Sequence, residues 1–573
     1  MRITNLLAIL VLNVLVAVSA GAQPAEDDAG GDTGAPAVNV TQAIDRMSQR
    51  EAALVSAMQG LHPVVETYLQ MVRSDEELGT VPASDHYFLG RLYFTDGFQE
   101  RFYTTKLEKT GWKASMLSPL ASANLAKHFF SVQFLPVGFS SMLFPDSRGF
   151  DRDRYTFHFL RREFLGDVRC LVFSVEPANQ GHGRFEGQIW VEDKEYNLVR
   201  FNGIYTHPVR NTYFHMDSWR TNVKPGLWVP TATYVEENGL KPNALKRTVR
   251  FKGQTRLWDY DQKPAGRQEE FTDIEVDTND RVEEETTSAP DFTPVMSLRA
   301  WEREAEDNVL DRLEQAGLLA PPGPMDKVLE QIVTNLEVGS GLEIEPDVRC
   351  RVLLTSPLES ATIGHTIIIS RGLIDVVPDE SSLALLLSVE LGSIARGEQI
   401  DTKYSFSDRL DFKDEAIYRE FVFKRTTQQE EAADSRALAL FNASIYRNKS
   451  DSAGLFLRQL QNRANGIPNL VQAHLGNSLV ENGSLNRLAA LIEAAPALQM
   501  SRVDQVAALP LGARIQVNPW DGSVELLQSR QVALLSAREK MPFEVAPVVI
   551  NLSRNRSTFT SASTSASVVT LMP

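Results

Sequence analysis

The sequence predicts an α+β protein: an N-terminal helix plus an antiparallel β meander, folded as a half-barrel or a sandwich, then a mainly helical domain and a small C-terminal β unit. Apolar residues recur at helical spacing up to residue 61, and short aromatic and β-branched runs separated by turn residues follow from about 85 to 258. Helical periodicity returns near residue 300. At roughly 100–200 residues per domain, 573 residues should form three or four compact units.

The composition excludes some classes of protein. The chain has 74 acidic against 58 basic side chains, a formal charge of −16, and no long Lys/Arg block, so nucleic acid is not an expected partner. Its two cysteines, Cys170 and Cys350, cannot form a disulfide framework and have no neighbours at metal-ligand spacing. We interpret them as buried apolar residues, with a bridge between them as the alternative.

The N-terminus has the form of an export signal. Arg2 precedes an apolar run from Leu6 to Val18, and Ala20-Gly21-Ala22 has the small-x-small form of a cleavage site. The run is about 13 residues long, shorter than the roughly 20 that cross a bilayer. Residues 1–22 therefore predict a signal peptide and a periplasmic or extracellular protein without a transmembrane segment after cleavage. A buried N-terminal helix is the alternative.

Two segments have compositions typical of disorder. Residues 23–38 are acidic and rich in Gly, Ala and Pro, which predicts a flexible linker. Residues 553–573 contain a Ser/Thr/Ala tract that buries little apolar surface, which predicts a disordered tail.

The first domain is predicted over residues 39–290. Thr41 can cap a helix whose apolar residues fall on one face: Ile44, Met47, Leu54, Val55, Met58 and Leu61. Pro63 is expected to break this helix or to restart it before Val64–Val72. The later apolar runs read as strands, and two pairs of them flank the polar turns at 192–197 and 224–226, as in antiparallel hairpins.

The helix followed by a meander, with the wording GQIWVEDKEYNLVRF, resembles the half-barrel domains of the LolA-like lipoprotein-sorting type. The resemblance implies a concave apolar face that holds acyl chains. Here that face would be lined by Ile189, Val191, Trp219, Trp228 and Trp258, with lipid or lipoprotein as the partner. The alternative is that these side chains are ordinary packing residues of the core.

The second domain is predicted over residues 300–510, followed by a small β unit over 511–552. Arg351–Leu354 and Thr366–Ile369 read as strands, and Asp379 is a suitable cap for an apolar helix over Ser381–Arg396.

The segments TIIISRGLID, DESSLALLLSVELGSIARGE and QQEEAADSRALAL resemble metallopeptidase family forty-eight, the HtpX and CAAX-prenyl-protease type of zinc endopeptidase. In that family one helix carries H-E-x-x-H and a second carries E-x-x-x-D. The resemblance implies that Val389 and Ser393 stand where the two zinc-binding histidines belong. It places Glu390 at the general base, Glu430 at the third ligand and Asp434 at its supporting acid.

The residues themselves argue against zinc. Two histidines four apart share a helix face and can bind one ion, whereas Val389 has no lone pair and Ser393 has only a neutral hydroxyl. His365 and His474 do not replace two ligands, so no cofactor is expected. The acids Glu390, Glu430 and Asp434 would then share protons, pair with Arg396 or Arg436, or bind calcium.

These observations favour an exported, non-catalytic pseudopeptidase of the cell envelope that binds peptides or proteins. The resemblance implies that Thr366–Ile369 is the strand edge that pairs with a peptide. Two alternatives remain. One is an active divergent zinc metalloendopeptidase with Glu390 as base and metal held by Glu430, Asp434 and His365. The other is a periplasmic lipid or lipoprotein carrier that uses the β-rich domain.

Overall fold

The computed structural model describes residues 39–75, 79–94, 99–102, 143–146, 149–165, 168–179, 184–205, 213–238, 250–260, 294–377, 379–397, 427–471, 488, 491, 493, 495–496, 513–517 and 524–528. The predicted signal peptide, linker and C-terminal tail, and His474, lie outside these residues. Within the described part of the chain, no helix is both long enough and apolar enough to cross a membrane.

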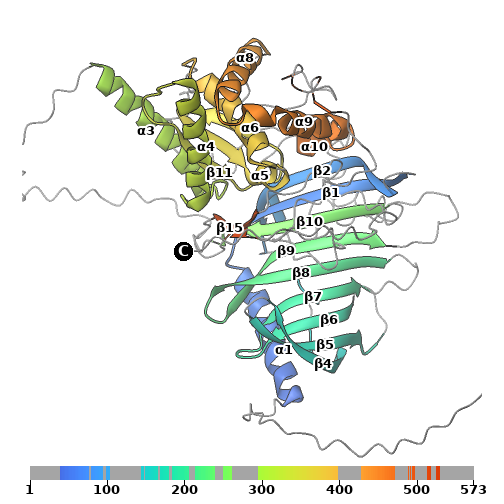
Figure 1. The fold of residues 1–573 in the computed structure, drawn as a ribbon. Coiled ribbons are helices and arrows are strands. Elements are labelled where there is room, and N and C mark those ends of the chain that lie inside the picture. Colours follow the sequence, from blue (N-terminus) through green and yellow to red (C-terminus); the bar gives the residue numbers. More distant parts are fainter. Residues whose placement is uncertain are drawn as a thin grey trace, which may run out of the picture.

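The first half of the chain forms one ten-stranded antiparallel sheet, in the order β3-β2-β1-β10-β9-β8-β7-β6-β5-β4 (Figure 1). Its strands are β1 (Val64–Asp75), β2 (Gly79–Tyr93), β3 (Gln99–Phe102), β4 (Tyr155–Leu165), β5 (Val168–Pro177), β6 (Phe185–Glu192), β7 (Leu198–Tyr205), β8 (Tyr213–Lys224), β9 (Leu227–Asn238) and β10 (Arg250–Trp258). The α+β class and the meander are confirmed, and a single sheet replaces the sandwich alternative.

The order of the strands along the chain explains most of their order in the sheet. Strands β4 to β10 follow one another as hairpins, and β10 then pairs with β1, with Val64 opposite Trp258. The expectation that a helix restarts at Val64 is wrong, because Val64–Val72 lies within β1. In this strand Val64 and Tyr68 face one side and Val65 and Leu69 the other, the period of two that a strand buried on both faces requires.

Helix α1 (Val40–Met58) covers one face of the sheet, here called the inner face. The helix begins one residue before the predicted cap, because the Asn39 side chain accepts a hydrogen bond from the Gln42 amide. Its buried side packs on apolar residues of the strands, among them Leu69, Phe173, Ile189, Val191 and Phe201. Gly187 and Gly203 lie opposite each other on β6 and β7, where a Cβ atom would collide with the neighbouring strand's backbone. Glycine is therefore required at this close approach.

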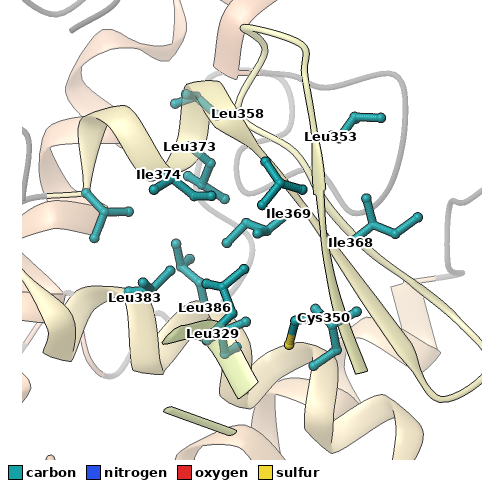
Figure 2. Packing of buried hydrophobic residues seen from close by; sticks show 14 of the residues in the cluster. Leu329, Cys350, Leu353, Leu358, Ile368, Ile369, Leu373, Ile374, Leu383 and Leu386 are labelled. Carbon is teal, nitrogen blue, oxygen red and sulfur yellow. The ribbon is translucent and has the colours of Figure 1, made fainter. Parts of the chain in front are cut away.

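The second half is mainly helical. Its elements are α3 (Pro294–Gln315), α4 (Pro324–Ser340), β11 (Arg349–Leu353), β12 (Ser360–Ile363), β13 (Thr366–Ser370), α5 (Arg371–Val376), α6 (Glu380–Ile394), α8 (Thr427–Ala443), a 3-10 turn η7 (Arg447–Lys449), α9 (Ser450–Ala464) and α10 (Pro468–Val471). Side chains from β13, α5 and α6, including Ile369, Leu373 and Leu386, converge on one apolar core (Figure 2).

A hairpin of β14 (Ala513–Val517) and β15 (Val524–Gln528) forms the small C-terminal β unit, as the sequence predicts. It contacts α4 and α5. The third predicted strand of this unit, at 545–552, lies outside the described residues.

The helical part covers the outer face of the sheet at β1, β2 and β10, above which it lies in Figure 1. Val64, Tyr68, Leu89 and Trp258 belong to the same buried cluster as the helical core. The Trp258 indole N–H donates to the Gly317 carbonyl at 2.7 Å. The sheet and the helical part therefore share one hydrophobic core.

Two buried carboxylates of the sheet, Glu66 and Asp85, form hydrogen bonds to the helical part. Glu66 accepts hydrogen bonds from the Arg256 guanidinium and from the backbone N–H and hydroxyl of Ser356, at 2.6 and 2.8 Å. Asp85 accepts from the Tyr68 hydroxyl at 2.9 Å and from the backbone N–H groups of Asn469 and Leu470, both within α10, at 3.0 and 2.9 Å. Each buried charge thus finds its partners across the junction, as burial demands.

Both cysteines are free and buried. The alternative of a bridge between Cys170 and Cys350 is therefore excluded. Burial raises the pKa of the Cys170 thiol to about 12, so this thiol is a packing residue rather than a nucleophile.

Candidate functional site

Helix α6 carries the residues that the sequence aligns with H-E-x-x-H. Asp379 caps it as predicted, accepting hydrogen bonds from the Ser382 backbone N–H at 2.8 Å and from the Ser382 hydroxyl at 2.9 Å. Every side chain from Ser381 to Ile394 is buried. The helix is therefore enclosed on all sides, whereas a catalytic zinc needs one coordination position open to water and substrate.

The two positions of the expected histidines are filled by packing residues. Val389 belongs to the apolar core of the helical part. The Ser393 hydroxyl is fully buried and makes no hydrogen bond to any residue that the structure describes. Neither side chain supplies the donor that a zinc ion requires.

Glu390 is also fully buried, and its carboxylate accepts a hydrogen bond of 2.7 Å from the Ser360 hydroxyl. Ser360 is the first residue of β12, so this bond ties the motif helix to the small sheet. A general base must reach a water molecule or a substrate proton. Here the carboxylate accepts a hydrogen bond from a hydroxyl of the small sheet.

Helix α8 packs against α6 at the motif. A Cβ atom at Gly392 would lie 2.9 Å from the Ala433 carbonyl oxygen, so glycine permits the close crossing of the two helices. Glu430 and Asp434 are four residues apart and share the α8 face that carries Ala433. Asp434 is buried and Glu430 half-buried. The structure thus brings the two motif helices together, while Arg396 and Arg436, the expected partners of the acids, are exposed.

His365 is engaged elsewhere. Its backbone N–H donates to Glu306 at 2.6 Å, and its Nδ1 lies 3.1 Å from the same carboxylate oxygen. Burial alone would raise the pKa of Glu306, but the hydrogen bonds from His365 and the neighbouring Arg303 outweigh it and lower that pKa. Among the described residues, no group of three or more His, Cys, Asp or Glu side chains is arranged to hold a metal ion.

The strand that was expected to be a peptide-pairing edge is not at an edge of the small sheet. The small sheet has the order β11-β13-β12, with β13 parallel to β11 and antiparallel to β12. The strand at Thr366–Ile369 is confirmed, but it is the central one, so its backbone groups are already paired on both sides. Within the described part of the chain the edges of this sheet are β11 and β12.

The three tryptophans of the expected ligand face have separate packing partners. Trp219 stacks on the Arg200 guanidinium, 4.3 Å from its ring centre, and Trp228 packs against a cluster that includes Trp190. Trp258 lies in the junction with the helical part. Ile189 and Val191, by contrast, face α1. The five residues therefore do not line one face.

A buried ion pair that the sequence does not predict lies beneath α1. Glu51 of α1 and Arg220 of β8 form a two-bond pair, and both side chains are almost fully enclosed. The pair borders a cavity of about 120 Å³, which Asn197 and Trp228 also line. The signal available in the sequence was the position of Glu51, which lies between Met47 and Leu54 on the apolar face of the helix.

Comparison with known proteins gives little. No family model matches the chain, and no curated protein matches it. Among solved structures, it is similar to a LolA superfamily protein from Nitrosomonas europaea, with 11% sequence identity and a TM-score of 0.18, over 38% of this chain and 91% of that one. A likeness of this size assigns no function. The metallopeptidase resemblance has no support from these comparisons, because no family model and no curated protein matches.

Proposed function

We propose that this protein is an exported, non-catalytic protein of the cell envelope whose helical part is a degenerate peptidase-like unit with a binding role. The observation that carries the proposal is the state of α6, where buried Val389 and Ser393 replace the expected ligands and Glu390 bonds to Ser360. The signal peptide predicted over residues 1–22 supports the location.

The binding role is assigned to peptide or protein rather than to a metal. An extended peptide adds to a sheet at an edge strand. In the small sheet the edge strands are β11 and β12 rather than β13, and β12 begins at Ser360, the residue bonded to Glu390. The degenerate motif would then help to hold the edge strand in place.

Activity and metal content test the proposal together. Purified protein should contain no stoichiometric zinc and should not cleave unfolded casein in zinc buffer. Glu390→Gln should change neither result. Casein cleavage that disappears in Glu390→Gln would overturn the proposal in favour of the divergent zinc endopeptidase, with Glu430 and Asp434 as ligands to be tested next by Glu430→Ala.

A second function, as a lipid or lipoprotein carrier, is favoured by one observation. The inner face of the sheet is apolar, and among the described residues it is covered by one helix, α1, together with Leu143, Phe144 and Phe150. A protein that binds acyl chains there should carry lipid through purification, detectable by native mass spectrometry, and should bind a fluorescent fatty acid. Failure of both measurements would remove this candidate.

A further inference from the structure

Strand β4 ends the ten-stranded sheet, and among the described residues only β5 pairs with it. Three large apolar side chains on β4 are open to solvent: Phe159 is 43% exposed, Leu160 44% and Phe164 68%. An edge strand with exposed apolar side chains is a template for pairing with another strand.

The direction of each side chain follows from the register. Phe159 lies opposite Phe173 of β5 and Arg161 opposite Val172, so Leu160 is the extra residue of a bulge. Phe173 packs on the inner face and Val172 on the outer face. After the bulge, Arg161 and Glu163 therefore point outward, whereas Arg162 and Phe164 point inward.

The sequence of this edge is nearly symmetric. Residues 159–165 read Phe-Leu-Arg-Arg-Glu-Phe-Leu, with Arg162 at the centre. When β4 is aligned antiparallel to a second β4 about Arg162, with the bulge counted as one position, Arg161 lies opposite Glu163 on the outer face. On the inner face Phe164 lies opposite Phe159 and Leu160. Both pairs occur twice, as a two-fold axis requires.

We propose that β4 pairs with β4 of a second copy of this chain, joining the two sheets into one continuous sheet. Opposite charges meet on one face and apolar side chains on the other, and the one like-charged contact is Arg162 with its own counterpart. Bulges and arginines on an edge strand oppose pairing in general. A strand that served only to prevent pairing would not expose three apolar side chains. The proposal is independent of the proposed function.

Cysteine cross-linking tests the register. Arg162→Cys places a thiol on the two-fold axis, and both native cysteines are buried. Under mild oxidation this variant should form a disulfide-linked dimer. Thr156→Cys, on the same strand, exposed and off the axis, is the matched control and should not. Equal cross-linking of both variants, or none in Arg162→Cys, would overturn the proposal.

Sedimentation of the mature protein gives a second test. An interface of one strand pair is small, so the dimer should dissociate on dilution. Phe164→Glu should abolish it, because it puts two carboxylates against apolar side chains. Val338→Glu on α4, a residue 77% exposed, is the control and should leave the dimer unchanged. A protein that is monomeric at every concentration, or a dimer that survives Phe164→Glu, contradicts the inference.

Discussion

At the scale of single residues, the motif of α6 is defined by what its buried atoms contact. Ser393 buries a hydroxyl without a hydrogen bond to the described residues, whereas the Ser360 hydroxyl donates a hydrogen bond to Glu390. An unmade buried hydrogen bond costs free energy, whereas a buried hydrogen bond to a carboxylate stabilises the fold. The two serines should therefore respond oppositely to truncation.

We expect Ser393→Ala to leave the free energy of unfolding unchanged or to raise it by up to about 1 kcal/mol. Ser360→Ala should lower it by about 1–3 kcal/mol, because Glu390 loses a donor. Urea denaturation followed by circular dichroism measures both. A large loss of stability in Ser393→Ala would mean that its hydroxyl has a partner in the folded protein.

Asp326 links stability to pH. Burial raises the pKa of its carboxyl to about 6, although the carboxylate accepts the Gly323 backbone N–H at 2.7 Å. Since the folded-state pKa lies above the unfolded one, the stabilisation is complete below the unfolded pKa and is lost as pH rises through about 6. At most this loss is roughly 3 kcal/mol.

The matched variant is Asp326→Asn, which keeps an acceptor for Gly323 but does not titrate. We expect wild type to lose stability relative to this variant between about pH 4 and pH 8. Denaturation midpoints measured across that interval give the difference. A difference independent of pH would mean that Asp326 titrates at its ordinary value.

At the scale of elements, α1 is held to the sheet by one buried ion pair as well as by apolar packing. Removing one member of such a pair leaves an uncompensated charge, which costs about 3–5 kcal/mol, whereas replacing both can be neutral. Glu51→Leu alone should therefore be strongly destabilising, because it leaves Arg220 buried without its carboxylate. The double variant Glu51→Leu with Arg220→Met should regain most of the loss.

A double-mutant cycle of these two positions measures the coupling directly. Arg152→Ala serves as the control, because its pair with Asp45 of α1 is exposed and should contribute at most about 1 kcal/mol. Additive effects of the Glu51 and Arg220 substitutions would contradict the pairing of α1 with β8.

The elements were predictable where local signals decide them. Asp379, the turn at 224–226 and the alternation along β6 and β7 are each read from a few neighbouring residues, and all three are confirmed. Val64–Val72 cannot be assigned from the sequence, because apolar residues without a clear period suit a helix and a strand buried on both faces equally well. The central place of β13 depends on pairing between distant segments, which no local pattern records.

The candidate site was predictable only in outline. The sequence places Val389, Glu390 and Ser393 on one helix, and the structure confirms that helix. The sequence does not reveal that the Ser360 hydroxyl donates to Glu390, or that His365 bonds to Glu306, because both contacts join segments far apart in the chain. Whether a motif faces water or core is likewise a tertiary property.

At the scale of the whole molecule, the sheet and the helical part share one core and two buried carboxylates. Arg256→Met should leave Glu66 buried without its cation and cost about 3–5 kcal/mol. Because the junction belongs to both parts, we expect one cooperative transition whose midpoint falls for sheet and helices together. Calorimetry, with far- and near-ultraviolet circular dichroism, follows it. Two separate transitions in the wild-type protein would contradict a shared core.

The junction at β1, β2 and β10 has a consequence for which substitutions this chain can accept over evolutionary time. The outer face of those strands carries buried Val64, Tyr68, Leu89 and Trp258, and Glu66 beside Arg256 accepts a hydrogen bond from the backbone above it. None of these requirements involves a metal. The helical part is therefore the wall against which the sheet folds, whatever else it binds, so the junction should tolerate few substitutions.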